Sequence, residues 1–425
     1  MIINFSIQNF GSIKDKQILS FEADKTTHLE DTYIVNIGGH RLLKLALIYG
    51  ANASGKTTIL KALDFLRKLV IAPQEKKTNI LNFEPFLFDP NTPKQPSVIS
   101  IEFFQNEVKY YYEVEFIKKA ILSEELYYYN PNKANIFKRK TNLENQVAKI
   151  EFGSKISIDK TTKKILEANT IWNNTVLGGY LKTNIDLKEL QEVSDWFKNY
   201  LFKLIVPEDT SLLNNFVKRM ILGKQISNAD VVSILKKADF NISAIDIIER
   251  DISVFGNKLS EFLLERSKES MYYFEVAHTV NNTKYTLPLE LESQGTNRYL
   301  GFAGLLAYII KKPTALPIDE LEASLHPDLY LHFLLSFLLN AKKSQLIATT
   351  HNREILDNKD IFRNDAIWFT DKQKGSATQV YSLADFDSTV IRNTTNILNA
   401  YKTGKLSATP NLGDTFIDLT HEKNQ

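Results

Sequence analysis

Apolar and polar residues alternate at the start of the chain, and this alternation predicts β-structure. Residues 3–7 place every second side chain on one face, and after a turn residues 17–21 are expected to return as a second strand. The run over 42–49 is apolar almost throughout, as in a strand that is buried on both faces. Apolar residues then recur at helical spacing over 56–70. The opening of the chain therefore predicts two strands, a buried strand and a helix.

Residues 97–129 carry the pattern of an antiparallel sheet. Apolar and aromatic side chains alternate over 98–104 and 109–116, and the short polar segment between them predicts a hairpin. Residues 121–129 are expected to add a third strand. Alternating aromatic residues suit strands with one buried face, and we favour that interpretation over stacking of these rings on nucleic-acid bases.

Helical spacing dominates from about residue 155 to 265, most clearly over 187–204, 212–221 and 229–238. No heptad register persists, so a coiled coil is not expected. Basic residues on these helices could contact nucleic acid, although a solvated helix face is the plainer interpretation. They are Lys218, Arg219, Lys224, Lys236 and Lys237.

The remainder of the chain reads as alternating strands and helices, which is typical of an α/β fold. The expected strands are 246–254, 272–278, 314–318, 344–349, 366–370 and 378–382. The expected helices are 295–311 and 326–340.

Composition narrows the class of protein. A length of 425 residues suggests two or three domains, and 43% hydrophobic with 24% charged residues is ordinary for a soluble protein. The net charge of +2 gives no global case for nucleic-acid binding. Cysteine is absent, which excludes disulfides and thiol catalysis. The start lacks a signal-peptide pattern and no long apolar run follows, so we expect a cytoplasmic protein without a membrane span.

The strongest chemical signal lies between the buried strand and the first helix. Residues 50–57 read Gly-Ala-Asn-Ala-Ser-Gly-Lys-Thr, the G-x-x-x-x-G-K-T pattern of a phosphate-binding P-loop. Glycines let backbone N–H groups turn toward phosphates, and the helix N-terminus adds partial positive charge. Lys56 would reach the β- and γ-phosphates of a nucleotide, and the Thr57 hydroxyl would bind Mg²⁺. The nucleotide-binding residues expected here are Gly50, Asn52, Ser54, Gly55, Lys56, Thr57 and Thr58.

Four weaker signals follow in order. They are a Ser-Gln-Gly element at 293–295, an apolar run ending in Asp319 and Glu320, the segment 323–327, and a strand that leads to His351. Each is common by itself, but each lies at a helix start or a strand end, where an α/β sheet presents side chains to a ligand. Their order downstream of a P-loop indicates the second half of a nucleotide-hydrolysing site.

With these motifs the chain resembles an ABC-type ATPase of the Rad50/SMC/RecF branch, and more closely the OLD-like ATPases of bacterial abortive-infection systems, of the RloA/AbiL type. Besides the P-loop, the resemblance rests on residues 1–12, 292–298, 325–327 and 401–410. It implies an α/β fold: an ABC-type P-loop ATPase head with a mixed sheet, an antiparallel β subdomain and a helical insertion. The divisions that it implies are 1–150 for the N-terminal lobe, 151–268 for the mainly helical insertion and 269–425 for the C-terminal lobe.

The resemblance also implies roles for the residues at the P-loop side of the site. Asp319 would hold Mg²⁺ together with Thr57, and Glu320 would be the general base for the attacking water. Lys56 would stabilise the transferring phosphoryl group. His351 would be the switch histidine near the γ-phosphate.

The remaining motifs imply an assembly. The Ser-Gln-Gly element would be the signature element of the family: Ser293 and Gly295 would contact the γ-phosphate bound by another subunit. Residues 324–327 would form a D-loop that crosses the interface. ATP and Mg²⁺ are therefore the expected cofactors. A homodimer or higher homo-oligomer with ATP at the subunit interface is the expected assembly.

Two positions depart from the family pattern. Pro317 lies where a central parallel strand needs a backbone N–H, so the strand either ends early or directs the missing N–H to an unpaired position. No glutamine can be assigned to the Q-loop, for which residues 85–89 are the expected region.

Three functions fit this class to different degrees. The resemblance favours an ATP-dependent sensor or regulator in a bacterial antiphage (abortive-infection) system. It would control a separate effector, expected to be a nuclease, in response to a phage trigger protein or nucleic acid. The alternative is a RecF/Rad50-like DNA-repair ATPase that binds DNA directly. A transporter subunit fits least, because 243 residues separate Gly50 from Ser293 (293 − 50).

Overall fold

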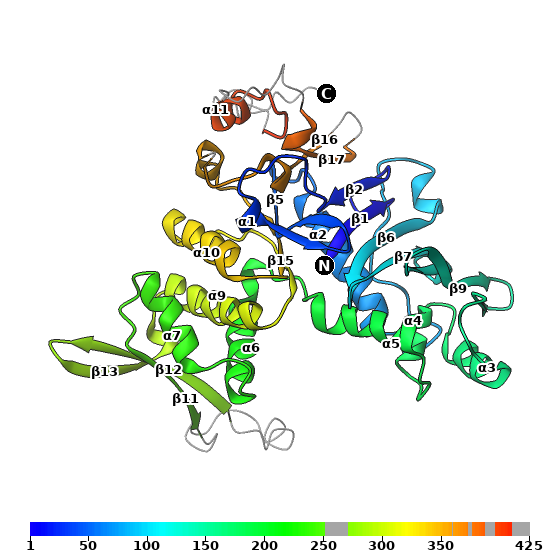
Figure 1. Ribbon diagram of the computed structural model, residues 1–425, viewed down its shortest axis with the longest axis horizontal. Coiled ribbons are helices and arrows are strands. Elements are labelled where there is room, and N and C mark those ends of the chain that lie inside the picture. Colours follow the sequence, from blue (N-terminus) through cyan, green and yellow to red (C-terminus); the bar gives the residue numbers. More distant parts are fainter. Residues whose placement is uncertain (251–270, 359, 373–375, 387–395, 410–425) are drawn as a thin grey trace, which may run out of the picture.

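The computed structural model describes residues 1–250, 271–358, 360–372, 376–386 and 396–409 (Figure 1). Two large sheets organise the chain, one of seven strands and one of five. A three-stranded sheet of β11 (Ala244–Arg250), β12 (Met271–Val280) and β13 (Thr283–Pro288) projects from the side of the molecule opposite to α3 (Lys160–Asn169). Of the strand expected over 246–254, residues 251–254 lie outside the described residues.

Every neighbouring pair in the seven-stranded sheet is antiparallel, in the order β10-β9-β8-β7-β6-β1-β2. Its strands are β1 (Ile2–Gln8), β2 (Gln17–Ser20), β6 (Ser97–Gln105), β7 (Val108–Ile117), β8 (Ala120–Tyr129), β9 (Lys133–Asn142) and β10 (Val147–Phe152). The predicted hairpin is confirmed, because Asn106 and Glu107 close β6 and β7 with φ angles of 48° and 64°, as in a two-residue type I′ turn. Phe103 and Tyr112 are fully buried, so aromatic residues build the core of this sheet.

The five-stranded sheet has the order β14-β15-β5-β16-β17, and its first four strands are parallel. The strands are β5 (Leu45–Gly50), β14 (Ala315–Ile318), β15 (Gln345–Thr349), β16 (Ile367–Lys372) and the antiparallel β17 (Thr378–Ser382). The strand that leads into the P-loop is therefore central, and strands from the last quarter of the chain flank it on both sides. All its residues are buried, which accounts for the continuous apolar run.

The strand expected over 42–49 is wrong in one respect, because two strands share this run. Leu42 and Leu43 end β4 (His40–Leu43), which pairs with β3 (Ile34–Ile37) in a small ribbon, and β5 begins at Leu45. Lys44 lies between them, and its buried Nζ donates to the carbonyl oxygens of Leu338 and Ala341. Apolar content alone does not reveal this change of partner.

Pro317 lies within β14, and the second of the two expectations for it is confirmed. Its carbonyl accepts a hydrogen bond from the N–H of Ile205, outside the regular sheet. Because N–H and C=O of one strand residue point the same way, the missing N–H faces this outer side rather than β15. Residues 201–205 contact β14 through only two isolated bridges, at Ala315 and Ile318. Strand pairing at this edge of the sheet therefore does not require the backbone N–H that Pro317 lacks.

The helices are α1 (Glu30–Tyr33), α2 (Lys56–Ile71), α3, α4 (Val176–Tyr180), α5 (Lys188–Asp195), α6 (Thr210–Leu222), α7 (Asn228–Lys237), α9 (Gln294–Lys311), α10 (Pro327–Asn340) and α11 (Ile397–Lys402). The helix expected over 187–204 is shorter than predicted: α5 ends at Asp195, a π-helical turn follows over Trp196–Tyr200, and the chain then extends beside β14. Trp196 opens this turn, and its ring is fully buried and stacks on Phe103 of β6 at 4.0 Å. None of the described helices has the length and apolar character that a membrane crossing requires.

Two glycines fix how α6 packs against α9. A Cβ atom at Gly301 would lie 2.8 Å from the Leu213 side chain, and one at Gly304 would lie 2.4 Å from Val217. The two glycines are one turn apart, so they form a continuous groove into which α6 fits. This close packing holds the helix that begins with the Ser-Gln-Gly element.

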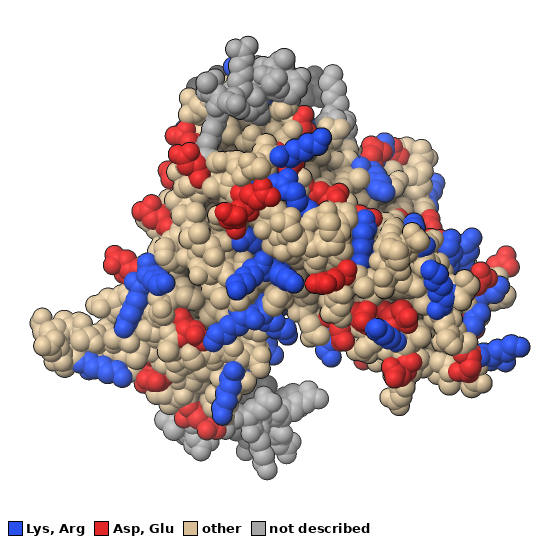
Figure 2. Space-filling model, viewed as in Figure 1, with Lys and Arg blue, Asp and Glu red and all other residues tan. Residues whose placement is uncertain are grey.

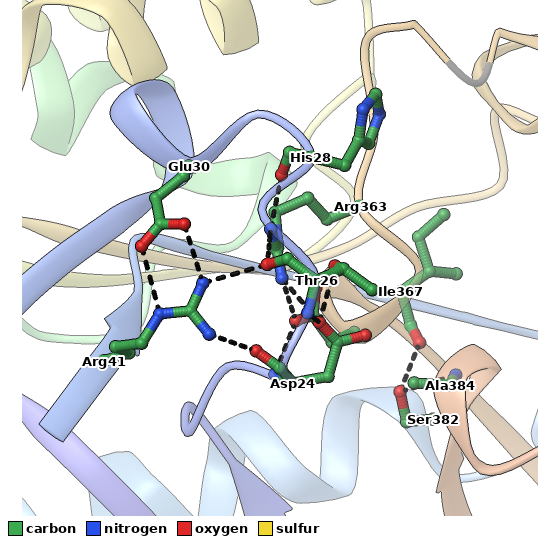
Figure 3. Close-up of polar contacts among 10 residues, drawn as sticks. Asp24, Thr26, His28, Glu30, Arg41, Arg363, Ile367, Ser382 and Ala384 are labelled. Carbon is green, nitrogen blue, oxygen red and sulfur yellow. Dashed lines mark hydrogen bonds and ion pairs between the residues drawn. The ribbon is translucent and has the colours of Figure 1, made fainter.

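A buried arginine, Arg363, connects residues 24–28 near the start of the chain to the segment 363–365 (Figure 3). The Arg363 side chain is 1% exposed and makes a two-pronged ion pair with Asp365, with N–O distances of 3.0 and 2.7 Å. It also pairs with Asp24 at 2.8 Å and donates to the carbonyl oxygens of Thr26 and His28. All five guanidinium donors can be used in such a site, which a lysine could not match.

We expect the substitution Arg363→Met to lower the free energy of unfolding by about 3 kcal/mol, because it leaves the Asp365 carboxylate buried without its partner. Urea denaturation followed by circular dichroism measures this. Lys25→Met, which removes an exposed charge from the same segment, should change stability by less than about 0.5 kcal/mol. Equal stability of the two variants would contradict a structural role for the buried pair.

Candidate nucleotide-binding site

The P-loop glycines are required by close approach of neighbouring hydroxyl groups. Gly55 has a φ of 106°, and a Cβ atom there would lie 2.2 Å from Thr378 Oγ1. A Cβ atom at Gly50 would lie 2.4 Å from Thr370 Oγ1. The loop is therefore pressed against β16 and β17, and a side chain at either position would displace it.

A set of hydroxyl groups that the motif did not reveal supports the loop from behind. Ser54 and Thr370 share a hydrogen bond of 2.6 Å, and Thr378 donates to the Ser54 carbonyl at 2.8 Å. The Thr378 and Ser12 hydroxyls share a 2.8 Å hydrogen bond, and Ser12 shares a 3.1 Å bond with Thr58. These hydroxyls come from both ends of the chain, so only the fold brings them together.

Lys56 begins α2 and is 6% exposed. Its Nζ donates to the carbonyl oxygens of Gly50 and Ala51, at 3.0 Å each, so the ammonium group lies inside the curve of the loop. Burial lowers the pKa of Lys56, whereas nearby Asp319 and Glu320 act to raise it. An ammonium group in this position is suited to meet phosphate charge.

Thr57 and Asp319, the two residues expected to hold Mg²⁺, are in direct contact. Thr57 donates to Asp319 Oδ1 at 3.0 Å, and Thr349 at the end of β15 donates to the same oxygen at 2.6 Å. The Thr349 hydroxyl in turn accepts the Glu320 N–H at 2.8 Å. One threonine thus fixes both the side chain of Asp319 and the backbone of Glu320. The sequence placed Thr349 at a strand end but gave no signal for this role.

Glu320 and His351 complete the group around Lys56. Both side chains are exposed, and Glu320 has a φ of 47°, which turns the chain sharply after β14. The His351 N–H donates to Glu322, a residue that the sequence did not single out. Partial desolvation, followed by the charge of Lys56, lowers the pKa of the His351 imidazole, although Glu322 and Glu320 oppose the shift.

The Ser-Gln-Gly element lies at the start of α9, close to segment 324–327. Ser293 is exposed and caps α9 by accepting the N–H of Thr296 at 3.0 Å. A Cβ atom at Gly295 would lie 3.4 Å from the carbonyl oxygen of Ser324. The structure therefore brings Lys56, Asp319, Glu320 and His351 together, and the hydrogen bonds of Ser293 are made within α9.

Arg298, one turn further along α9, connects the helix of the Ser-Gln-Gly element to Glu320 at the P-loop side of the site. It is 3% exposed and donates to the carbonyl oxygens of Pro207 at 2.8 Å and Glu320 at 3.4 Å. Burial lowers the pKa of Arg298, and the nearby Glu322 carboxylate is the main influence in the opposite direction. Arg298 lies within residues 292–298, on which the family resemblance partly rests, but its hydrogen bond to Glu320 could not be predicted from sequence spacing.

The fold and this site are those of a P-loop nucleotide-binding domain. Residues 45–357 match the family described as "AAA domain, putative AbiEii toxin, Type IV TA system", and the chain belongs to that family. No curated protein matches it.

The solved structures to which the chain is similar include SMC head domains. One is an SMC head bound to the C-winged helix domain of ScpA (13% identity, TM-score 0.47, 90% of this chain and 97% of that chain covered). Another is the SMC head of Thermotoga maritima (12%, 0.40, 90% and 98%). A third is an SMC head with an extended coiled coil bound to the C-terminal domain of ScpA from Pyrococcus furiosus (11%, 0.41, 90% and 96%). The assignment rests on the family match and the geometry above.

We expect Thr349→Val to weaken binding of Mg-ATP by about tenfold while changing binding of metal-free ATP less, because Asp319 loses the hydroxyl that orients it. Removing this acceptor also leaves the Glu320 N–H unpaired, at a cost of about 1–2 kcal/mol of stability. Titrations of ATP with and without Mg²⁺ measure the first effect. Thr350→Val, which removes a neighbouring buried hydroxyl, is the control, and an equal loss in both variants would refute the special role of Thr349.

Proposed function

We propose that this protein binds and hydrolyses ATP as a nucleotide-dependent switch, and that the switch regulates a separate effector in a bacterial abortive-infection system. The observation that carries the catalytic part is the 3.0 Å contact between the Thr57 hydroxyl and the Asp319 carboxylate beside the buried Lys56. Hard oxygen donors in this arrangement fit Mg²⁺. When bound, Mg²⁺ would neutralise charge on the β- and γ-phosphates.

The residues of the chain would divide the work of hydrolysis between them. The P-loop N–H groups and Lys56 hold the phosphates, so most of the rate enhancement comes from positioning and charge stabilisation. Glu320 follows Asp319 directly, and its exposed carboxylate can accept a proton from the attacking water. His351 lies within the electrostatic reach of Lys56 and Glu320, as a residue near the γ-phosphate should.

A second subunit would complete the site. Ser293 is exposed and its hydrogen bonds are made within α9, so it is free to meet a nucleotide bound by another chain. Segment 324–327 beside it is also largely exposed, as a surface that forms an interface requires. This arrangement supports a head-to-tail homodimer with ATP between the P-loop of one subunit and the signature element of the other.

The role in defence rests on the family and on the resemblance of the motifs. The family description itself names a putative toxin of a type IV toxin–antitoxin system. The OLD-like resemblance favours a sensor or regulator rather than the effector itself. Within the described residues no group of three His, Asp or Glu side chains is arranged to hold a metal ion.

Glu320→Gln should bind ATP, hydrolyse it at least about a hundredfold more slowly, and accumulate as a dimer, because it lacks the base but keeps every phosphate contact. Solution mass by light scattering, with and without Mg-ATP, measures the dimer. Co-expression with the product of the neighbouring gene tests whether an effector joins it.

Two further variants serve as controls. Ser293→Arg in the Glu320→Gln background should bind ATP but remain monomeric, and Lys56→Ala should not bind ATP. A dimer that forms equally well with Ser293→Arg would refute the role of the signature element. A dimer that ignores the neighbouring product and binds DNA would support a repair ATPase instead.

A further inference from the structure

A basic cavity of about 590 Å³ lies away from the residues of the nucleotide site, where α2, α6, α9 and the segment after α5 meet. Its lining includes the cationic side chains of Arg67, Lys198, Lys203, Arg219 and Lys312. Leu201 pairs with Ala315 at the first residue of β14, whereas Asp319 follows its last residue. The cavity is therefore at the opposite end of β14 from the ATP site.

Helical spacing aims several of these side chains at the cavity. Leu212, Asn215, Phe216 and Arg219 recur at intervals of three and four residues, so they share one face of α6. Tyr308 and Lys312 are four residues apart at the C-terminal end of α9, and Lys312 lies over the Tyr308 ring at 5.8 Å. The rings of Phe202, Phe216 and Tyr308 pack edge to face and form an apolar floor.

Five cationic side chains from different elements converge on this floor, and among the described residues no carboxylate lines it. None of the five belongs to an ion pair among the described residues. Figure 2 shows Lys and Arg side chains gathered over the middle of this face, where Figure 1 places α6 and α9. Repulsion among the five positive charges disfavours this arrangement. A concave site lined by positive charges raises the local concentration of anions.

We infer that this cavity binds a small molecule that carries several phosphate groups. Its volume is that of a small-molecule site, whereas a nucleic-acid duplex would require cations spread along an extended surface. Five positive charges suit the charge of a triphosphate chain. The amide groups of Asn199 and Asn215 add hydrogen-bond donors, and Arg67 is held in place because its Nε donates to the Leu201 carbonyl at 2.7 Å.

The cavity is physically connected to the ATP site by two routes. Arg67 lies about three turns after Lys56 on α2, the helix that follows the P-loop. The segment that begins at Leu201 continues to Ile205, whose carbonyl accepts the Asp319 N–H at 2.8 Å. A ligand that draws these elements together would therefore act on residues that hold the nucleotide.

Calorimetric titration with inorganic triphosphate tests the site, using full-length protein with the Lys56→Ala substitution so that the P-loop does not contribute. We expect saturable binding to one site. Adding Lys198→Ala and Arg219→Ala should weaken it by at least about tenfold. Both side chains are exposed, so the thermal midpoint should not change.

Lys164→Ala with Lys236→Ala is the matched control, because it removes two exposed charges from α3 and α7 and should leave the affinity unchanged. Absence of binding, or equal affinity in the cavity variant and the control, would overturn the inference. A single-stranded oligonucleotide that binds more tightly than triphosphate, and loses affinity in the cavity variant alone, would overturn the assignment to a small molecule. The test needs no ATP hydrolysis, so its result is independent of the proposed function.

Discussion

The pairing of β5 with β15 on one side and β16 on the other is the constraint on which the site depends. These strands are separated from β5 by about 300 residues of sequence, yet they carry the groups that complete the P-loop. Thr349 ends β15 and orients Asp319, while Thr370 of β16 supports Ser54. The P-loop residues are adjacent in sequence, but the residues that hold them in place come from distant segments of the chain.

The middle of the chain is part of this construction. Residues 201–205 run beside β14, and Ile205 holds the backbone of Asp319 where the sheet has no further regular strand. The glycines of α9 let α6 pack closely, which sets the position of the signature element. A segment that reads as an addition in sequence therefore supports the carboxylate end of β14.

Sequence reasoning succeeded where one short segment contains the whole signal. The P-loop, α2 and the carboxylates after β14 were predicted because strand, turn and helix chemistry is local. It failed where partners come from distant segments. The hydroxyls of Ser12 and Thr378 have no common motif, and β9 is rich in charged residues that hide its alternation. Arg219 was noticed only as a basic residue, because the other cations of its cavity lie on three further elements.

The Glu322 carboxylate acts on charged groups of both the P-loop and the helix that begins with the Ser-Gln-Gly element. Lys56, Arg298 and His351 all experience the field of this one carboxylate, and Glu322 also accepts the His351 N–H. Arg298 belongs to the signature helix, whereas Lys56 belongs to the P-loop. Because both are desolvated, a change in charge at the P-loop would alter how strongly Glu322 attracts each of these two cations. Such a change would connect the P-loop, within one chain, to the helix that begins with the Ser-Gln-Gly element.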